Sequence, residues 1–117
     1  MDEKEKQILN TYSNYSIEIK STIGVSFDTY KTIISFFQGF LNYFLVSFIR
    51  ELDKNEKNHF ESYINSIKKI CSDNKVEVLI SRNCPKCLDV NSFYVRFSKC
   101  YFTVGCFNGD CHYYKEF

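Results

Sequence analysis

The stretch NCPKCLDVNSFYVRFSKCYFTVGCFNGDCHYYKEF, residues 83–117, decides the fold of the C-terminal third of this chain. It contains the pair Cys84 and Cys87, then eighteen intervening residues, then the pair Cys106 and Cys111. Two tight turns that each offer two thiolates can close a tetrahedral site for zinc. A proline inside the first pair fixes φ there and leaves backbone amides free to donate to the sulfurs. The sequence therefore predicts Zn²⁺ bound by these four cysteines.

The residues around and between the two pairs alternate apolar and polar side chains, as short strands do. Residues 92–97 and 100–104 have the length of a hairpin that turns at 98–99, and residues 76–80 form a further alternating segment. We therefore expect the second part of the chain, residues 76–117, to be a small antiparallel β unit of the zinc-ribbon type.

The first part of the chain has the apolar period of helices instead, with apolar residues three and four positions apart. We expect three helices, over residues 3–20, 28–54 and 58–73. The predicted fold class is α+β. An N-terminal three-helix unit occupies residues 1–75, and the antiparallel β zinc ribbon of residues 76–117 packs on it.

The second of these helices, with Asp28 as its N-cap, is apolar over most of its circumference. Residues 32–49 carry no charge and reach the lower limit of a membrane span, but Ser35, Gln38 and Asn42 make a polar stripe that favours a buried helix. Three helices cannot easily bury all the large side chains of this one, and exposed apolar patches usually mark association. We therefore expect a second copy or a protein partner to bind the helix at four phenylalanines, Phe36, Phe40, Phe44 and Phe48.

Other residues could change the set of metal ligands. Cys100 lies six residues before Cys106 and could replace it, although Cys106 and Cys111 share one turn. His112 could replace a thiol, although neighbouring ligands rarely both reach one metal ion. The remaining cysteine, Cys71, is expected in the core at the end of the third helix.

The six cysteines also indicate a compartment. The N-terminal residues MDEKEKQIL carry charges of both signs and no apolar region, so we expect no secretory signal. A reducing interior follows, in which metal binding or burial outcompetes disulfide formation. Two alternatives remain for the paired cysteines: free thiols buried in a core, and a redox-active CxxC motif, although no convincing helix begins after Cys87.

The chain carries little net charge and no pattern typical of catalysis. Its formal net charge is +1 and is spread evenly, so no basic stripe predicts many phosphate contacts. A site closed by four thiolates has no open position for water. With only two histidines, His59 and His112, and no glycine-rich phosphate loop, the sequence predicts no catalytic residue and no enzyme.

The run from Cys84 to Tyr114 resembles the zinc-binding segment of primases. It has Asn-Ser-Phe-x-Val at residues 91–95, then Tyr101 or Phe102, and a final Cys-Phe-Asn-Gly-Asp-Cys turn that an aromatic pair follows. Primase-polymerases and herpesvirus-type primases carry a similar SN or SF stretch before a strand and a similar closing C-x4-C pair. The bacterial primase zinc ribbon is similar in its CP start, its SF-x-V strand and its later turn.

This resemblance implies a metal site at the same four cysteines. It also implies nucleic-acid contacts from five nearby residues, Lys86, Arg96, Lys99, Tyr101 and Phe107. It implies no polymerisation, because residues 1–83 resemble no primase catalytic domain. Those families also generally place a histidine where this chain has Cys87.

The expected order of a short, a long and a short helix, with Val25, Ser26 and Asp28 just before the long one, resembles a histone fold. In that fold a second copy or a partner covers the long helix. The alternative is an ordinary helical bundle closed by the C-terminal sheet.

These features together predict a non-catalytic zinc-binding accessory of a replication or transcription assembly, which contacts nucleic acid or a polymerase subunit. The alternative is a structural or assembly protein, for example of a large DNA virus, in which zinc only stabilises a small core. The chain has no alanine and twelve lysines against three arginines, which indicates an AT-rich genome, such as that of a large DNA virus or a base-biased parasite. We expect an intracellular protein, in the cytoplasm or nucleus, including those of a virus-infected cell.

Overall fold

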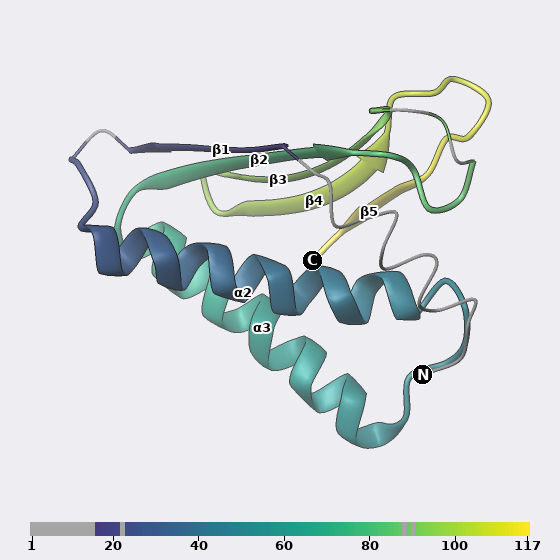
Figure 1. Cartoon of the computed structure of the whole chain (residues 1–117), viewed down its shortest axis with the longest axis horizontal. Coiled ribbons are helices and arrows are strands. Elements are labelled where there is room, and N and C mark those ends of the chain that lie inside the picture. The colour runs from purple at the N-terminus through teal and green to yellow at the C-terminus, as the bar shows by residue number, and fades with distance from the viewer. Residues whose placement is uncertain (1–15, 22, 88, 90) are drawn as a thin grey trace.

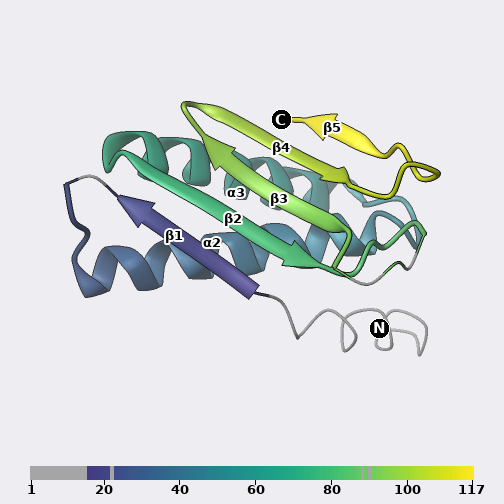
Figure 2. The same cartoon turned by 90° about the horizontal axis from the view of Figure 1, so that it is seen from above.

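Five strands and two helices form the described part of the chain, residues 16–21, 23–87, 89 and 91–117 of this computed structural model. In chain order the elements are β1 (Ser16–Ser21), α2 (Phe27–Val46), α3 (Lys54–Asp73), β2 (Val76–Arg82), β3 (Phe93–Ser98), β4 (Tyr101–Cys106) and β5 (Tyr114–Glu116). The strands make one antiparallel sheet in the order β1-β2-β3-β4-β5. Both helices lie against the same face of that sheet, so the fold has two layers (Figure 1). Seen from above, no described element covers the other face (Figure 2).

The predicted three-helix N-terminal unit is wrong, because residues 16–21 of its expected first helix form strand β1. The remainder of that expected helix, residues 3–15, lies outside the described residues. In β1 the side chains of Ile17 and Ile19 are half-buried while the residues between and after them are exposed, which is the two-residue period of a strand. Strand β1 pairs with β2 along its whole length.

The long apolar helix begins and ends at residues other than those expected. Its N-cap is Ser26, whose hydroxyl accepts a hydrogen bond from Thr29 N, and α2 ends at Val46. Helix α3 begins after Asp53, whose carboxylate accepts from Glu56 N while the Glu56 carboxylate accepts from Asp53 N. This reciprocal capping satisfies two backbone donors at the start of α3. The expected helix of residues 28–54 therefore ends early, at Val46, and the capping pair starts a second helix.

The expected alternating segments at residues 76–80, 92–97 and 100–104 correspond to β2, β3 and β4. Lys99 and Cys100, with φ angles of 49° and 70°, form the two-residue turn between β3 and β4. Positive φ at both central residues is the geometry that matches the twist of a tight hairpin. The sheet thus takes β1 from the first of the two units predicted from the sequence and its other four strands from the second.

The core lies between the helices and the helix-facing side of the sheet. Alternate residues of β2, β3 and β4 are buried there, and α2 supplies several phenylalanines to meet them. Phe40 is 0 % exposed, and its ring centroid lies 4.8 to 5.5 Å from those of four other rings, Phe44, Phe60, Phe102 and Phe117. The sheet therefore packs on the apolar side of α2.

Helix α2 contains most of the uncharged run of residues 32–49, which reaches the lower limit of a membrane span and carries the four phenylalanines expected at a partner interface. Within the described part of the chain, neither helix combines the length and the apolar character needed to cross a bilayer. Of the four phenylalanines expected at an interface, Phe40 and Phe44 are buried in the core and already have partners within the chain. Phe36 and Phe48 are half-buried at its margin. Association through this helix stays a prediction.

Alternation along the strands gives the sheet one buried face and one face directed away from the helices. We call the second the open face. Its middle row crosses all five strands, because the strand register places five residues side by side, Glu18, Leu79, Arg96, Thr103 and Glu116. The same alternation that fills the core therefore also fixes which side chains meet on the open face.

The central position of Phe40 makes its replacement a test of the core. We expect Phe40→Ala to lower the free energy of unfolding by about 3–5 kcal/mol, because truncating a buried aromatic ring loses its transfer free energy and leaves a cavity. Phe27→Ala, which removes a ring that is 72 % exposed, is the control and should change it little. Chemical denaturation measures both values. A loss for Phe40→Ala that depends on protein concentration would instead place this ring in an interface between chains.

The start of α3 gives a pH prediction. Hydrogen bonds from Arg50 and from Asp53 N hold the pKa of Glu56 at about 2, below its ordinary 4.5. Since the folded state lowers this pKa, the stabilisation by the ionised carboxylate is present above pH about 4.5 and is lost as the pH falls toward 2. Thermal melting should show that Glu56→Gln destabilises the protein near neutral pH and matches it near pH 2. Glu61→Gln, on the exposed side of the same helix, is the control.

Candidate metal centre

Four sulfur atoms gather at one end of the sheet, those of Cys84, Cys87, Cys106 and Cys111. All lie within 4.8 Å of one another. The Sγ atoms of Cys84 and Cys111 are 3.8 Å apart, and those of Cys87 and Cys106 are 3.7 Å apart. A tetrahedral metal ion with metal–sulfur bonds of about 2.3 Å has edges of about 3.8 Å between its ligands. The four cysteines can therefore hold a metal ion.

The register of three strands brings these cysteines together. Arg82 at the end of β2 pairs with Phe93, and Phe93 pairs with Cys106 at the end of β4. Cys84 follows Arg82 by two residues and so lies at the same end of the sheet as Cys106. The first turn then supplies the second thiol of its pair, and the loop between β4 and β5 supplies Cys111.

Each turn directs a backbone amide at a sulfur. Lys86 N donates to Cys84 Sγ at 3.4 Å, and Asn108 N donates to Cys106 Sγ at the same distance. The side-chain amide of Asn108 reaches Cys87 Sγ at 3.8 Å. Hydrogen bonds of this kind favour thiolates over thiols and orient them toward a metal ion.

The environment of the thiols differs from one side of the cluster to the other. Cys84 is fully buried, and burial raises its pKa to about 12. Cys87 is exposed, and a hydrogen bond from the backbone of Asp89 lowers its pKa to about 7. Burial also raises the pKa of Cys111. A metal ion that binds here must displace protons from the buried thiols, so its affinity rises with pH.

Aromatic side chains and one buried cation lie next to the cluster. Tyr113, whose ring centroid is 6.3 Å from that of Phe44 and 6.2 Å from that of Phe93, joins the loop to the core. Arg82 is 1 % exposed and places a positive charge at this end of the sheet. Sequence analysis missed Arg82, although it continues the buried alternation of Val76, Val78 and Ile80.

The remaining cysteines and histidines lie outside the cluster. Cys100 is in the turn at the far end of β4, six residues before Cys106, or about 20 Å along an extended strand. Its sulfur lies 3.6 Å from Ser72 Oγ instead. Cys71 is buried in the core, and burial raises its pKa to about 12. His112 is exposed and is not part of the four-residue cluster.

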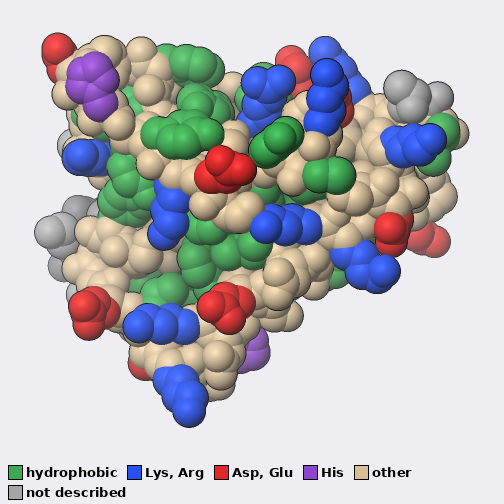
Figure 3. Space-filling model, turned by 180° about the vertical axis from the view of Figure 1, so that it is seen from behind, with side chains coloured by type: hydrophobic (Ala, Val, Ile, Leu, Met, Phe, Trp, Pro, Cys, Tyr) green, Lys and Arg blue, Asp and Glu red, His purple; other side chains and the backbone are tan. Residues whose placement is uncertain are grey.

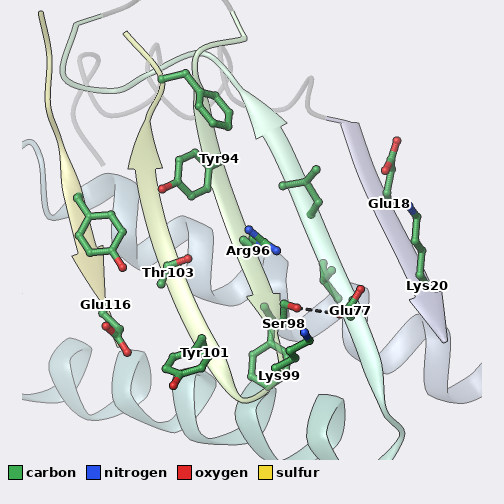
Figure 4. Close-up of a pocket in the computed structure, with 15 residues that line it drawn as sticks. Glu18, Lys20, Glu77, Tyr94, Arg96, Ser98, Lys99, Tyr101, Thr103 and Glu116 are labelled. Carbon is green, nitrogen blue, oxygen red and sulfur yellow. Dashed lines mark hydrogen bonds between the residues drawn. The ribbon is translucent and has the colours of Figure 1, made fainter. Parts of the chain in front are cut away.

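The five residues expected to contact nucleic acid fall into two places. Arg96, Lys99, Tyr101 and Phe107 line a shallow depression of about 740 Å³ on the open face. Figure 4 shows Arg96, Lys99 and Tyr101 there, together with Tyr94 and Thr103. The fifth residue, Lys86, lies between Cys84 and Cys87, and its ammonium is 6.0 Å from the centroid of the Tyr113 ring. The open face therefore collects four of the five.

Charge on the open face is balanced. Lys20, Arg96 and Lys99 line the depression, and so do the acidic residues Glu18, Glu77 and Glu116. The side of the molecule drawn in Figure 3 likewise shows basic, acidic and hydrophobic side chains interspersed. The described surface thus agrees with the flat charge distribution of the sequence.

No family model, curated protein or solved structure matches this chain. The resemblance of residues 84–114 to the zinc-binding segment of primases therefore stays a prediction, as does the resemblance to a histone fold. The absence of catalysis also stays a prediction.

The geometry of the cluster predicts its metal content. Protein purified under reducing conditions should carry one thiophilic metal ion per chain. Cys84→Ser and Cys111→Ser should each lose most of it, because three thiolates and a hydroxyl bind such an ion far more weakly. Cys100→Ser removes a cysteine from the other end of the sheet and should keep the full content. Elemental analysis measures all four proteins. Equal metal content in the three variants, or none in the parent protein, would contradict the assignment of these sulfurs.

Proposed function

We propose that this protein is a non-catalytic, zinc-binding accessory of a nucleic-acid-processing assembly, and that the open face of its sheet contacts the nucleic acid. One observation carries the proposal: a closed cluster of four cysteines stands at the end of a sheet whose uncovered face gathers aromatic and basic side chains. The cluster supplies the rigid framework, and the open face supplies the contact.

Zinc is the metal that best fits the cluster. The distances of 3.7 and 3.8 Å between sulfurs correspond to bonds of about 2.3 Å, which is the usual zinc–sulfur length. All six cysteines are free thiols, as in a reducing compartment. With four protein ligands the ion has no open position for water, so its role is structural. It adds on the order of 10 kcal/mol to the folding of the turns that hold it.

Nucleic acid is the contact that the open face supports. Tyr101 and Phe107 are 64 % and 71 % exposed and line the same depression, and exposed apolar side chains that gather in one place mark binding sites. Arg96 and Lys99 lie among them. The resemblance of the cysteine segment to primase zinc-binding segments supports the same class of partner.

A second function has an observation in its favour. Three basic and three acidic residues line the open face, so it carries no excess of positive charge. A structural or assembly protein, in which zinc only stabilises the fold, would show such a face toward another protein. The two functions differ in whether any nucleic acid binds.

A charge reversal on the open face separates them. We expect the double variant Arg96→Glu, Lys99→Glu to lose binding to nucleic acid at low salt, because two phosphate contacts become repulsions. The control is Lys57→Glu, Lys69→Glu, which makes the same change of charge at exposed positions of α3. Fluorescence anisotropy with single-stranded and duplex DNA and RNA measures the affinity, and metal content verifies that each variant is folded. Undetectable binding by the parent protein at low salt would favour the structural function.

A further inference from the structure

The strand register sorts the open face into rows of different chemistry. The row next to the metal centre contains Tyr94 on β3, Gly105 on β4 and Tyr114 on β5, which are paired in that order. The middle row contains Arg96 on β3. The row nearest the hairpin turn contains Tyr101 on β4. Aromatic rings thus lie on both sides of a central guanidinium, at intervals of two residues or about 7 Å along the strands.

In the first row an aromatic ring lies over β4, because Gly105 has no side chain. A Cβ atom at Gly105 would lie 2.5 Å from the Tyr94 hydroxyl, so the Tyr94 ring lies over the backbone of β4. Glycine in a strand permits such a close approach. The Phe107 ring stands 4.7 Å from that of Tyr94, and the Tyr114 ring is 61 % exposed on the neighbouring strand. One pair of contacting rings and a third ring two strands from Tyr94 therefore lie at this end of the open face.

The charges of the face are ordered as well. Lys20 and Glu77 are paired on β1 and β2, so their charges largely cancel. Glu18 and Glu116 lie on the two edge strands, each two strands or about 10 Å from Arg96. Positive charge is left along the centre of the sheet, with acidic groups on both borders. A single narrow polyanion can lie along this centre, whereas the two backbones of a duplex would extend over the acidic borders.

We propose that the open face binds single-stranded nucleic acid, with unpaired bases stacked on Tyr101, Tyr114 and Phe107 and phosphates at Arg96 and Lys99. This proposal rests on the proposed function and names the class of its ligand. Bases in a duplex are stacked on one another and present no free faces to the rings. Base stacking contributes about 1–3 kcal/mol for each ring, or about fivefold to 150-fold in affinity, and tolerates any base sequence. With only two phosphate contacts, the affinity depends weakly on salt.

The metal centre holds the aromatic end of this site. Cys106 directly precedes Phe107, and Cys111 precedes Tyr114 by three residues. Strand β5, which carries Tyr114, has three residues, and all of them are exposed. Besides its pairing with β4 and the packing of Phe117, its position therefore depends on what fixes the preceding loop. Zinc at the four cysteines would hold the loop that begins with Phe107 and leads to Tyr114, so chelation of zinc should weaken the binding of a single strand.

The test is a set of anisotropy titrations with the zinc-loaded full chain and labelled oligothymidylate and oligouridylate. Tyr101→Ala, Tyr114→Ala and Phe107→Ala should each weaken binding about tenfold, and Tyr101→Phe should retain it because the ring face remains. Phe27→Ala removes an equally exposed ring from the helix layer and should change nothing. The slope of log affinity against log salt should be about −1.4 for two phosphate contacts, and Arg96→Gln should reduce its magnitude by about 0.7.

The outcomes separate this proposal from the more general one. A duplex that binds as tightly as the single strand, a steep salt dependence, or unchanged affinity in all three alanine variants would overturn the single-strand site and leave a nucleic-acid role intact. No binding of any nucleic acid at low salt would overturn both proposals. It would favour the alternative function, in which the open face contacts another protein. Weaker binding in the alanine variants, with the matched control unchanged, supports the single-strand site.

Discussion

The register of β2, β3 and β4 is the constraint on which the rest of the structure depends. It sets Arg82 beside Phe93 and Phe93 beside Cys106, and so brings the two cysteine turns to one end of the sheet. A shift of one residue between two of these strands would turn core side chains such as Val95 to the open face. The same shift would move Cys106 relative to Cys84. One set of backbone hydrogen bonds therefore fixes both the core and the metal centre.

The end of the chain shows how the two are joined. Strand β5 buries none of its three side chains, and a short exposed strand contributes little stability of its own. Cys111 fixes the loop before it. After it, the Phe117 ring packs on Phe40 and Phe102, and Phe117 N donates to Phe102 O at 2.8 Å. The strand is thus held at one end by the cysteine cluster and at the other by the core.

The sequence predicts local features of this chain better than distant pairings. The cysteine spacing predicts the cluster because it depends on two short turns and a hairpin. Strand β1 was missed because Ile19 fits both a helical and an alternating pattern, and its pairing partner Val78 lies far along the chain. The interruption of the long helix has a local signal that could have been used, the Asp53-x-x-Glu56 capping box. The burial of Phe40 has no local signal, because the sequence of a helix does not show which other element will pack against it.

The alternation of β4 links the metal centre to the open face. Phe102 and Val104 are buried in the core, Gly105 lies under the Tyr94 ring on the open face, and Cys106 returns to the side of the core. The next residue therefore points outward, and it is Phe107. A metal ion that holds the Cys106 side chain toward the core would therefore also hold the Phe107 side chain toward the open face. In so small a protein, an ion held by the four cysteines would thereby also orient an exposed aromatic ring.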